Sequence, residues 1–258
     1  MPEYRDQLNR TITLDRAPVR ILSLVPSQTE LLFDLGLKNE VAGITSFCIR
    51  PEAWYNSKTR VGGTKKLDLH KIRNLQPDLV IGNKEENDRS QIEELMTSYP
   101  VWMSDVKTLP DALDMIHGIG NLCARSSQAD EITRQITNRF KDLPTPKTER
   151  KAAYFIWRKP WMAAGQGTFI NEMMKYCGLT NCFMDSRYPE ISFEILRKAN
   201  PQTIILSSEP YPFKEKHLLE FQEVCPKSEI MLVDGEFFSW YGSRLLNAPE
   251  YFREHIFK

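Results

Sequence analysis

The feature that most constrains the fold of this chain is an internal repeat. Residues 67–86 read LDLHKIRNLQPDLVIGNKEE, and residues 191–210 read ISFEILRKANPQTIILSSEP. Each copy predicts a short amphipathic helix, an X-Pro step that ends the helix, a buried strand and a polar loop. Pro77 and Pro201 hold the equivalent places. Two similar α/β lobes in one chain predict a small-molecule site in a cleft between them.

Charge and length exclude several classes of protein. The 258 residues carry 34 Lys+Arg and 34 Asp+Glu, and this balance favours neither nucleic acid nor an anionic membrane as a partner. No apolar run approaches the ~18 residues of a membrane helix. The first residues, MPEYRDQLNRTITL, lack the apolar stretch of a secretory signal. Two alternatives follow: a cytoplasmic protein if Met1 is the true start, or a sequence that begins after a removed signal.

The residues that most often bind metals are scattered. No C-x-x-C pair and no Cys/His cluster occurs, so we expect no zinc site, and we expect the cysteines to be buried free thiols. The histidines lie on predicted helices, where we expect solvated faces. The cysteines are Cys48, Cys123, Cys177, Cys182 and Cys225, and the histidines are His70, His117, His217 and His255.

Strands alternate with helices along most of the chain, which predicts mostly parallel sheets with right-handed crossovers. Ser27 followed by Glu30 predicts a capping box at the start of the first helix. The segment 46–66 has no periodicity and is expected to be a loop. The expected strands are 20–25, 41–45, 79–82, 101–103, 152–157, 203–206 and 230–233, and the expected helices are 68–75, 88–99, 168–177, 192–199 and 214–224.

The segment 109–143 is expected to be one long helix. It contains two apolar stripes, one from Leu109 to Leu122 and one from Ile132 to Phe140, and little strand or turn signal. A partly exposed helix that bridges two lobes has this pattern. We therefore expect an N-terminal α/β lobe at 1–108, a bridging helical region at 109–143 and a C-terminal α/β lobe at 144–258.

Candidate ligand-binding residues follow the predicted strands, because ligands of open α/β sheets bind at the carboxyl ends of strands. Aromatic rings recur in these loops together with cations and amides. Such a set suits a large, flat ligand with some negative charge or carbonyl oxygens. For any one ring, local packing is the more frequent role. The candidates are Phe47, Arg50, Asn83, Trp157, Arg158, Trp161, Tyr211, Phe238 and Trp240.

Signals of catalysis are weak. The sequence contains no G-x-S-x-G, no P-loop and no dinucleotide fingerprint. Ser23 and Ser27 lie near a strand end, but no paired base is visible. We predict no catalytic residue, and a binding protein is favoured over an enzyme.

Several stretches carry a resemblance to a known family. RILSLVPSQTELLFDLGL and VGGTKKLDLHKIRNLQPDLVIG resemble the first lobe of the substrate-binding proteins of cobalamin and iron–siderophore importers. WMAAGQGTFINEMMKYCGLTNCF and the second repeat copy resemble the second lobe. The resemblance covers roughly 20–245. It implies two Rossmann-like lobes joined by one long helix, and capture of a metal chelate for an ABC permease in the periplasm, without catalysis.

The resemblance also assigns roles to individual residues. It places Phe47 in the cleft, Trp157 and Trp161 in a second-lobe loop, and Phe238 and Trp240 near the last loop. Relatives often carry tryptophan where this chain has Thr64 and Asn83. Relatives dock on their importer through one glutamate per lobe, early in the helix before L-x-P. Glu194 matches this pattern in the second lobe, and His70 stands at the first-lobe position.

Two other functions stay open at this point. One is a cytoplasmic protein that holds a corrinoid or tetrapyrrole, and the other is an enzyme that uses the same cleft. The expected ligand is cobalamin-like or a ferric siderophore. No intrinsic cofactor, no resident metal and no nucleic acid are expected, and the chain is expected to be a monomer.

Overall fold

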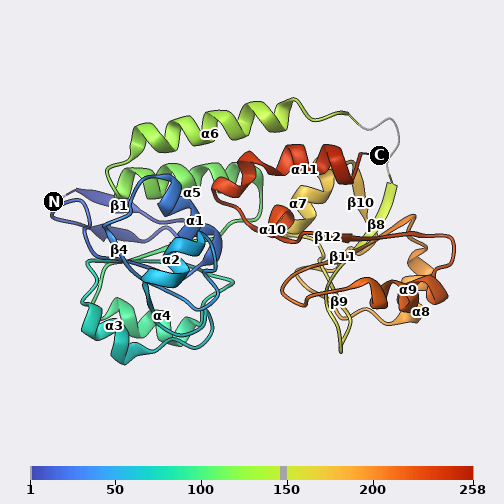
Figure 1. Cartoon of the computed structure of the whole chain (residues 1–258), viewed down its shortest axis with the longest axis horizontal. Helices are drawn as coiled ribbons and strands as arrows, with labels where there is room; N and C mark the ends of the chain where they lie inside the picture. The colour runs from blue at the N-terminus through green and yellow to red at the C-terminus, as the bar shows by residue number, and fades with distance from the viewer. Residues whose placement is uncertain (1, 146–149, 258) are drawn as a thin grey trace. The chain divides into compact units, whose positions relative to one another are not determined.

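A computed structural model describes residues 2–145 and 150–257 of the chain (Figure 1). By its internal contacts the chain divides into two compact units. Unit 1 comprises the chain up to Val106, with Pro110–Ile136 and Tyr241–Arg244. Unit 2 comprises Lys107–Leu109, Thr137–Trp240 and the chain from Leu245. None of the described helices is both long and apolar enough to cross a membrane.

Unit 1 contains a five-stranded parallel sheet in the order β5-β4-β3-β6-β7. The first strand of the sheet in the sequence, β3, is also its central strand. Strands β4 and β5 lie on one side of β3, and β6 and β7 lie on the other. The strand order therefore reverses between β3 and β6, which is where ligands of such sheets bind. The strands are β3 (Ile21–Ser23), β4 (Val41–Ile44), β5 (Thr59–Arg60), β6 (Leu79–Asn83) and β7 (Val101–Ser104).

The helices of unit 1 pack around this sheet, and α3 and α4 lie side by side (Figure 1), joined by an ion pair of 2.6 Å between Arg73 and Glu94. Short strands β1 and β2 form an antiparallel hairpin. The elements are β1 (Glu3–Arg5), β2 (Thr11–Thr13), α1 (Pro26–Asp34), α2 (Glu52–Ser57), α3 (Leu69–Leu75) and α4 (Arg89–Met96).

The start of α1 differs from the sequence expectation. Its N-cap is Val25, with no side-chain cap, so Ser27 and Glu30 do not form a capping box. Glu30 instead forms an ion pair with Arg244, with 2.6 Å between Oε1 and Nη2. The Tyr241 hydroxyl donates to Glu86 Oε1 at 2.6 Å. These two interactions join the segment Tyr241–Arg244 to the remainder of unit 1.

The segment 109–143 is helical, as expected, but it contains two helices, α5 (Leu109–Leu122) and α6 (Ser126–Lys141). Ala124 lies between them with φ of 53°, a left-handed conformation that does not continue a helix. A Cβ on Gly120 would lie 2.3 Å from the Ala129 Cβ, so the two helices need glycine there to pack together. The boundary between the units, after Ile136, falls within α6.

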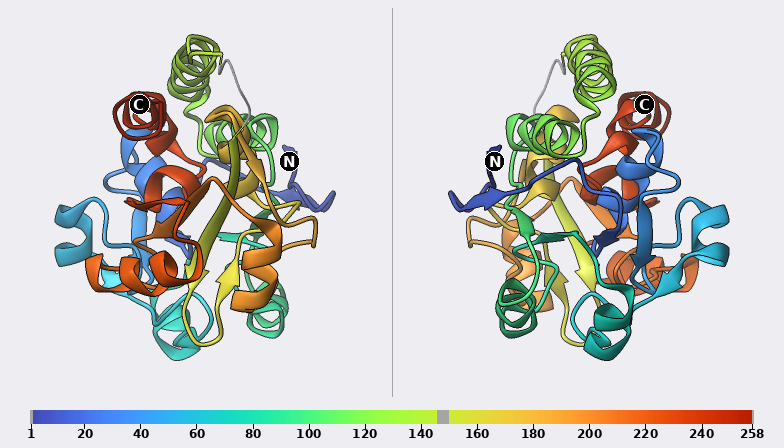
Figure 2. Two further views of the ribbon diagram at one scale, coloured as in Figure 1. Left: turned by 90° about the vertical axis from the view of Figure 1, so that its right-hand side faces the viewer. Right: turned by 90° about the vertical axis from the view of Figure 1, so that its left-hand side faces the viewer.

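Unit 2 contains a parallel sheet in the order β10-β8-β11-β12, with β9 antiparallel to β8. The long strand β8, yellow-green in Figure 2, begins this sheet, and the strand order reverses between β8 and β11. The strands are β8 (Arg150–Trp157), β9 (Met162–Ala163), β10 (Leu179–Asn181), β11 (Thr203–Ser207) and β12 (Glu229–Val233).

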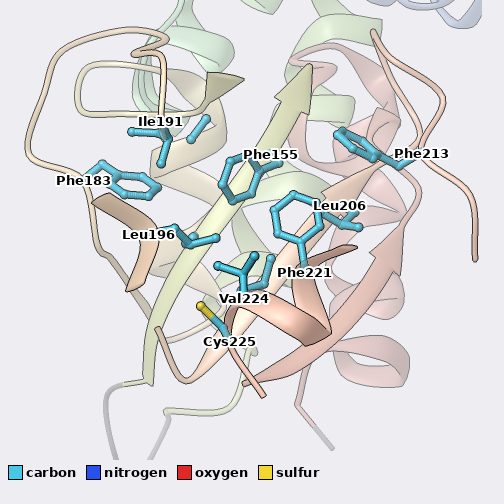
Figure 3. Close-up of a cluster of buried hydrophobic side chains, with 12 residues drawn as sticks. Phe155, Phe183, Ile191, Leu196, Leu206, Phe213, Phe221, Val224 and Cys225 are labelled. Carbon is cyan, nitrogen blue, oxygen red and sulfur yellow. The ribbon is translucent and has the colours of Figure 1, made fainter. Parts of the chain in front are cut away.

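The helices of unit 2 enclose an aromatic core. Phe155, Phe213 and Phe221 meet in one buried cluster (Figure 3), and the rings of Phe155 and Phe221 are 4.8 Å apart. The comparable cluster of unit 1 is aliphatic, with Leu22 and Val80 among its members. The helices are α7 (Phe169–Tyr176), α8 (Phe193–Ala199), η1 (Glu215–His217), α9 (Leu218–Val224), α10 (Glu236–Ser239) and α11 (Ala248–His255). The short helix η2 (Ser243–Leu246) begins in unit 1 and ends in unit 2.

The predicted fold class of mostly parallel α/β sheets is confirmed, and the repeat corresponds to α3–β6 and α8–β11. The short elements α2, β5, β9 and β10 were not expected. The three strands were missed because two or three residues are too few to show a period, and α2, with six residues, is shorter than two helical turns. All five cysteines are free, and Cys182 is the one that is only partly buried.

Candidate functional site

The most exposed ring among the candidates of unit 2 is that of Trp157, the last residue of β8. Trp157 is 40% exposed, and its ring meets that of Tyr211 edge to face at 5.9 Å. Tyr211 follows β11, and its N–H donates to the Ile156 carbonyl at 3.2 Å. The two rings therefore lie at the carboxyl ends of β8 and β11, where the strand order reverses. We call this pair, Trp157 and Tyr211, the aromatic ledge.

The aromatic ledge rests on rings that lead into the core. Tyr211 contacts Phe213 at 4.9 Å between ring centroids, and Phe213 stacks on Trp161 at 6.1 Å. Trp161 also contacts Phe221 at 4.9 Å, so its ring is part of the core packing. A chain of rings held from below keeps Trp157 in place while its outer face stays open to solvent.

Arg158 is engaged by its neighbours. Its guanidinium forms a two-point ion pair with Glu220, with distances of 2.9 Å and 3.3 Å, and it lies 5.4 Å from the ring centre of Trp161. A bidentate pair of this kind fixes the orientation of an arginine. The Arg158 guanidinium is therefore held in place beside the ring of Trp161.

Phe238, in helix α10 after β12, and Trp240, at the end of that helix, are packed within unit 2. Phe238 is fully buried, with Tyr154 and Phe252 at 5.1 Å and 4.9 Å between ring centroids. Trp240 is 6% exposed, and its Nε1–H donates to Glu209 Oε1 at 3.0 Å. The sequence placed both rings at a ligand surface, because nothing in a strand-ending loop distinguishes an inward ring from an outward one.

Glu209 connects the loops that follow β11 and β12. Its Oε1 accepts from Trp240 and from the Ser239 hydroxyl at 2.5 Å. Burial raises the pKa of the Glu209 carboxyl; the Ser239 bond opposes this rise, and the Glu236 carboxylate adds to it. A Cβ on Gly235 would lie 2.7 Å from Glu209 Cγ, so glycine permits this close contact.

Unit 1 presents an exposed apolar surface after β4. Phe47 is 60% exposed, and Ile49 beside it is 48% exposed. A Cβ on Gly63 would lie 3.1 Å from the Phe47 ring, so the ring lies against bare backbone. Arg50 follows on the same exposed loop. This loop provides an apolar ring and a cation at the carboxyl edge of the unit 1 sheet.

Asn83, the last residue of β6, is 2% exposed and forms a turn. Its Oδ1 accepts from the N–H groups of Glu85 and Glu86 at 2.8 Å and 3.1 Å, and its Nδ2 donates to Ser104 Oγ at 2.9 Å. These bonds use both ends of the amide. We therefore assign Asn83 to the structure of the turn and not to ligand contact.

His70 and Glu194 occupy the same place in the two repeat copies, each as the second residue of its helix, α3 or α8. Glu194 is exposed and pairs with Lys198 at 2.9 Å. The Nδ1 of His70 lies 3.5 Å from the Asn74 amide nitrogen. Both side chains are accessible on the surfaces of their units, as contact with another protein requires.

The expectation for His217 was wrong. It is 3% exposed, with Tyr211 and Phe213 each 5.6 Å away between ring centroids. The signal available in the sequence was the run of aromatic residues just before it, which can bury an imidazole. Across residues 2–145 and 150–257, no cluster of three or more His, Cys, Asp or Glu side chains could hold a metal ion.

The chain is similar to known binding proteins. It is 26% identical over 242 residues to the vitamin B12-binding protein of Pectobacterium carotovorum, a match that covers 90% of this chain and 86% of that protein. The crystal structure of the periplasmic vitamin B12 binding protein of Vibrio cholerae superposes with a TM-score of 0.79 at 23% identity, covering 92% of this chain and 97% of that one. The crystal structure of a possible iron-binding periplasmic solute-binding protein of Staphylococcus epidermidis superposes with a TM-score of 0.78 at 22% identity, covering 94% of this chain and 100% of that one.

These superpositions show the two-unit α/β fold. The model of the family described as periplasmic binding protein matches residues 21–224, which is most of the chain and includes the whole of both repeat copies. The resemblance expected from the sequence is thereby confirmed. The chain belongs to the periplasmic binding protein family, a family of solute-binding proteins.

Proposed function

We propose that this protein captures a metal chelate, either a cobalamin-like corrinoid or a ferric siderophore, and delivers it to an ABC permease without catalysing a reaction. Family membership supports the binding role. The names of relatives that bind vitamin B12, or possibly iron, support the class of ligand. No second function has an observation in its favour.

The aromatic ledge is the observation that carries this proposal. A tryptophan that is 40% exposed, backed by Tyr211 and placed where the strand order reverses, offers a flat apolar face at low entropic cost. Corrinoids and many chelates present large rigid surfaces that can pack on such a face. In unit 1, Phe47 and Arg50 supply a ring and a cation for the same class of ligand.

The other candidates have supporting roles in this proposal. Trp161 and Arg158 hold the ledge from below, and Trp240 joins loops through Glu209. Phe238 belongs to the core, and Asn83 shapes its own turn. Ligand contact is thus concentrated in Trp157, Tyr211, Phe47 and Arg50.

A fluorescence and visible-absorption titration with cyanocobalamin, haem and a ferric siderophore tests the proposal. Burying a tryptophan face contributes about 1–3 kcal/mol, so Trp157→Ala should weaken binding roughly tenfold or more. Trp54→Phe is the matched control, because Trp54 is 4% exposed and packs on Phe33 in unit 1. Equal affinity of Trp157→Ala and the wild type, or binding of none of the three chelates, would contradict the proposal.

We also propose that Glu194 and His70 contact the permease. Their equivalent positions, one in each unit, and their exposure support this role. Transport by a reconstituted permease should fall with Glu194→Ala but not with Glu215→Ala, a substitution of another exposed glutamate of unit 2. Equal transport by the two variants would exclude docking through Glu194.

Delivery to a permease of the cell envelope requires that the protein act outside the cytoplasm, and we propose this location. Relatives described as periplasmic support it. Fractionation of cells that express the native gene tests it directly. Recovery of the protein only in the cytoplasmic fraction would contradict delivery to an importer.

A further inference from the structure

His217 lies directly beneath the aromatic ledge. Its ring packs against those of Tyr211 and Phe213, both at 5.6 Å between ring centroids, with interplanar angles of 62° and 87°. Its Nε2 lies 3.3 Å from the Tyr211 hydroxyl, and its Nδ1 lies 2.9 Å from the backbone nitrogen of Lys214. Both ring nitrogens therefore have partners, on opposite sides of the imidazole.

These contacts determine where the imidazole carries its proton. The Lys214 backbone N–H can only donate, so Nδ1 accepts and carries no proton. In the neutral ring the proton is then on Nε2, which donates to the Tyr211 hydroxyl oxygen. The two bonds hold the loop before η1 and the Tyr211 side chain in one arrangement.

The arrangement extends to Trp157 through Tyr211. The Tyr211 ring meets the Trp157 ring at 71°, and its backbone is bonded to Ile156, the residue before Trp157. A shift of Tyr211 removes the ring that packs edge to face against the Trp157 indole. The position of the most exposed ring of unit 2 thus depends on the hydrogen bonds of a buried imidazole.

We propose that His217 is a positioning residue that sets Tyr211 against Trp157, and that protonation of His217 loosens the aromatic ledge and weakens ligand binding. This proposal rests on the proposed function of the ledge. A proton on Nδ1 would point at the Lys214 N–H, so two donors would face each other and that bond would be lost. Ligand held at neutral pH would then be released more readily in weak acid.

Burial and the neighbouring charges shift the pKa of His217. Burial, the largest cause, lowers the pKa of His217 below its ordinary value of 6.5, and the cations of Lys216 and Arg158 lower it further. The carboxylate of Glu220 acts in the opposite direction. The ring is thus neutral at pH 7, and folded-state stability is lost as the pH falls through 6.5 toward the lowered pKa.

The first experiment needs no ligand. In a spectrum of 15N-labelled protein, the neutral His217 should show its proton on Nε2. The emission of Trp157 should change as the pH falls from about 7 to about 5, and this change should be absent in Trp157→Phe and in His217→Gln. His217→Gln retains a donor toward Tyr211 but does not titrate. His217→Asn retains the acceptor toward Lys214 and should also abolish the change.

The second experiment measures affinity for whichever chelate the wild type binds, at about pH 7.5 and about pH 5.5. Wild-type affinity should fall roughly tenfold, as expected for the loss of one partly buried hydrogen bond, while His217→Gln should change less than about twofold. His255→Gln is the control, because His255 is an exposed histidine that stacks on Tyr251 away from the ledge.

The outcomes separate the two proposals. Failure to bind any chelate, with the Trp157 transition intact and dependent on His217, refutes the proposed function and supports the positioning role. A proton found on Nδ1, or a Trp157 transition that persists in both His217 variants, overturns the positioning role whatever the ligand. Equal pH dependence of affinity in the wild type and His217→Gln also overturns it.

Discussion

The two copies of the repeat have the same helix, proline and strand, but they differ in the loop that follows the strand. Helices α3 and α8 are capped at their starts by Asp68 and Ser192, and both end on a left-handed residue before the equivalent prolines. Strands β6 and β11 are buried along their whole length. After the strands, Asn83 Oδ1 and Ser207 Oγ each accept the N–H of the residue two positions later, at 2.8 Å and 3.3 Å.

The copies differ at the residue four positions after Asn83 and Ser207. In unit 1 Asn87 is 4% exposed, and its Oδ1 accepts the Asn83 N–H at 2.8 Å, so the turn closes on itself. In unit 2 the same place is held by Tyr211, whose ring extends the sheet edge toward Trp157. A shared scaffold thus sets where a loop begins, while one side chain decides whether the loop closes on itself or places an aromatic ring at the edge of the sheet.

The largest effects should come from the cores beneath the two turns. Ile204 and its counterpart Val80 are both fully buried. Ile204→Ala should lower the free energy of unfolding by about 3–4 kcal/mol, and Val80→Ala by about 1 kcal/mol less because fewer methyl groups are removed. Urea denaturation of both variants tests this. The reverse order would show that the aromatic core of unit 2 adapts to a cavity better than the aliphatic core of unit 1.

The two turns should differ in their dependence on the side chain that forms them. Asn83→Ala removes two acceptor bonds and one donor bond from a buried site, and should cost about 2–3 kcal/mol. Ser207→Ala removes the longer bonds from Glu209 and from the Tyr154 hydroxyl, and should cost about 1 kcal/mol. Equal losses in the free energy of unfolding, measured by urea denaturation, would mean that the two turns depend equally on these side chains.

Glu209 should give unit 2 a pH dependence of stability. Because its pKa is raised by burial, the folded state binds the proton more tightly than the unfolded chain. Its contribution to stability is therefore largest below the ordinary value of 4.5 and is lost as the pH rises through the raised pKa. Glu209→Gln keeps an acceptor for Trp240, and should raise stability at neutral pH and reduce the slope between about pH 5 and about pH 7. A variant less stable than the wild type at neutral pH would contradict this.

The smallest effect should come from the left-handed residues Gln76 and Asn200, with φ of 46° and 48°. Asparagine tolerates this conformation better than glutamine does. Gln76→Gly should therefore stabilise the protein by about 0.5–1 kcal/mol, and Asn200→Gly by a few tenths at most. Thermal unfolding can resolve the pair. A larger gain at Asn200 would show that its side chain has no local role.

The sequence predicted the repeated scaffold because its determinants are local. An X-Pro step, a helix period and a buried apolar run are each visible within about ten residues, as in 67–86. The direction of side chains after a strand is not local. Trp157 ends β8 and Phe238 follows β12 in α10, and only the packing of Tyr154 and Phe252 makes Phe238 part of the core. His217 was misplaced for the same reason.

The interactions that complete unit 1 have a consequence for the timing of folding. Arg244 pairs with Glu30, and Tyr241 with Glu86, so unit 1 needs residues synthesised more than 150 positions later. During synthesis the sheet β3–β7 can form early, but the sites that receive Tyr241 and Arg244 stay open until Thr137–Trp240, the larger part of unit 2, has been synthesised. A long closing loop slows the final step. Unit 1 therefore obtains its complete set of contacts only when synthesis of the chain is nearly finished.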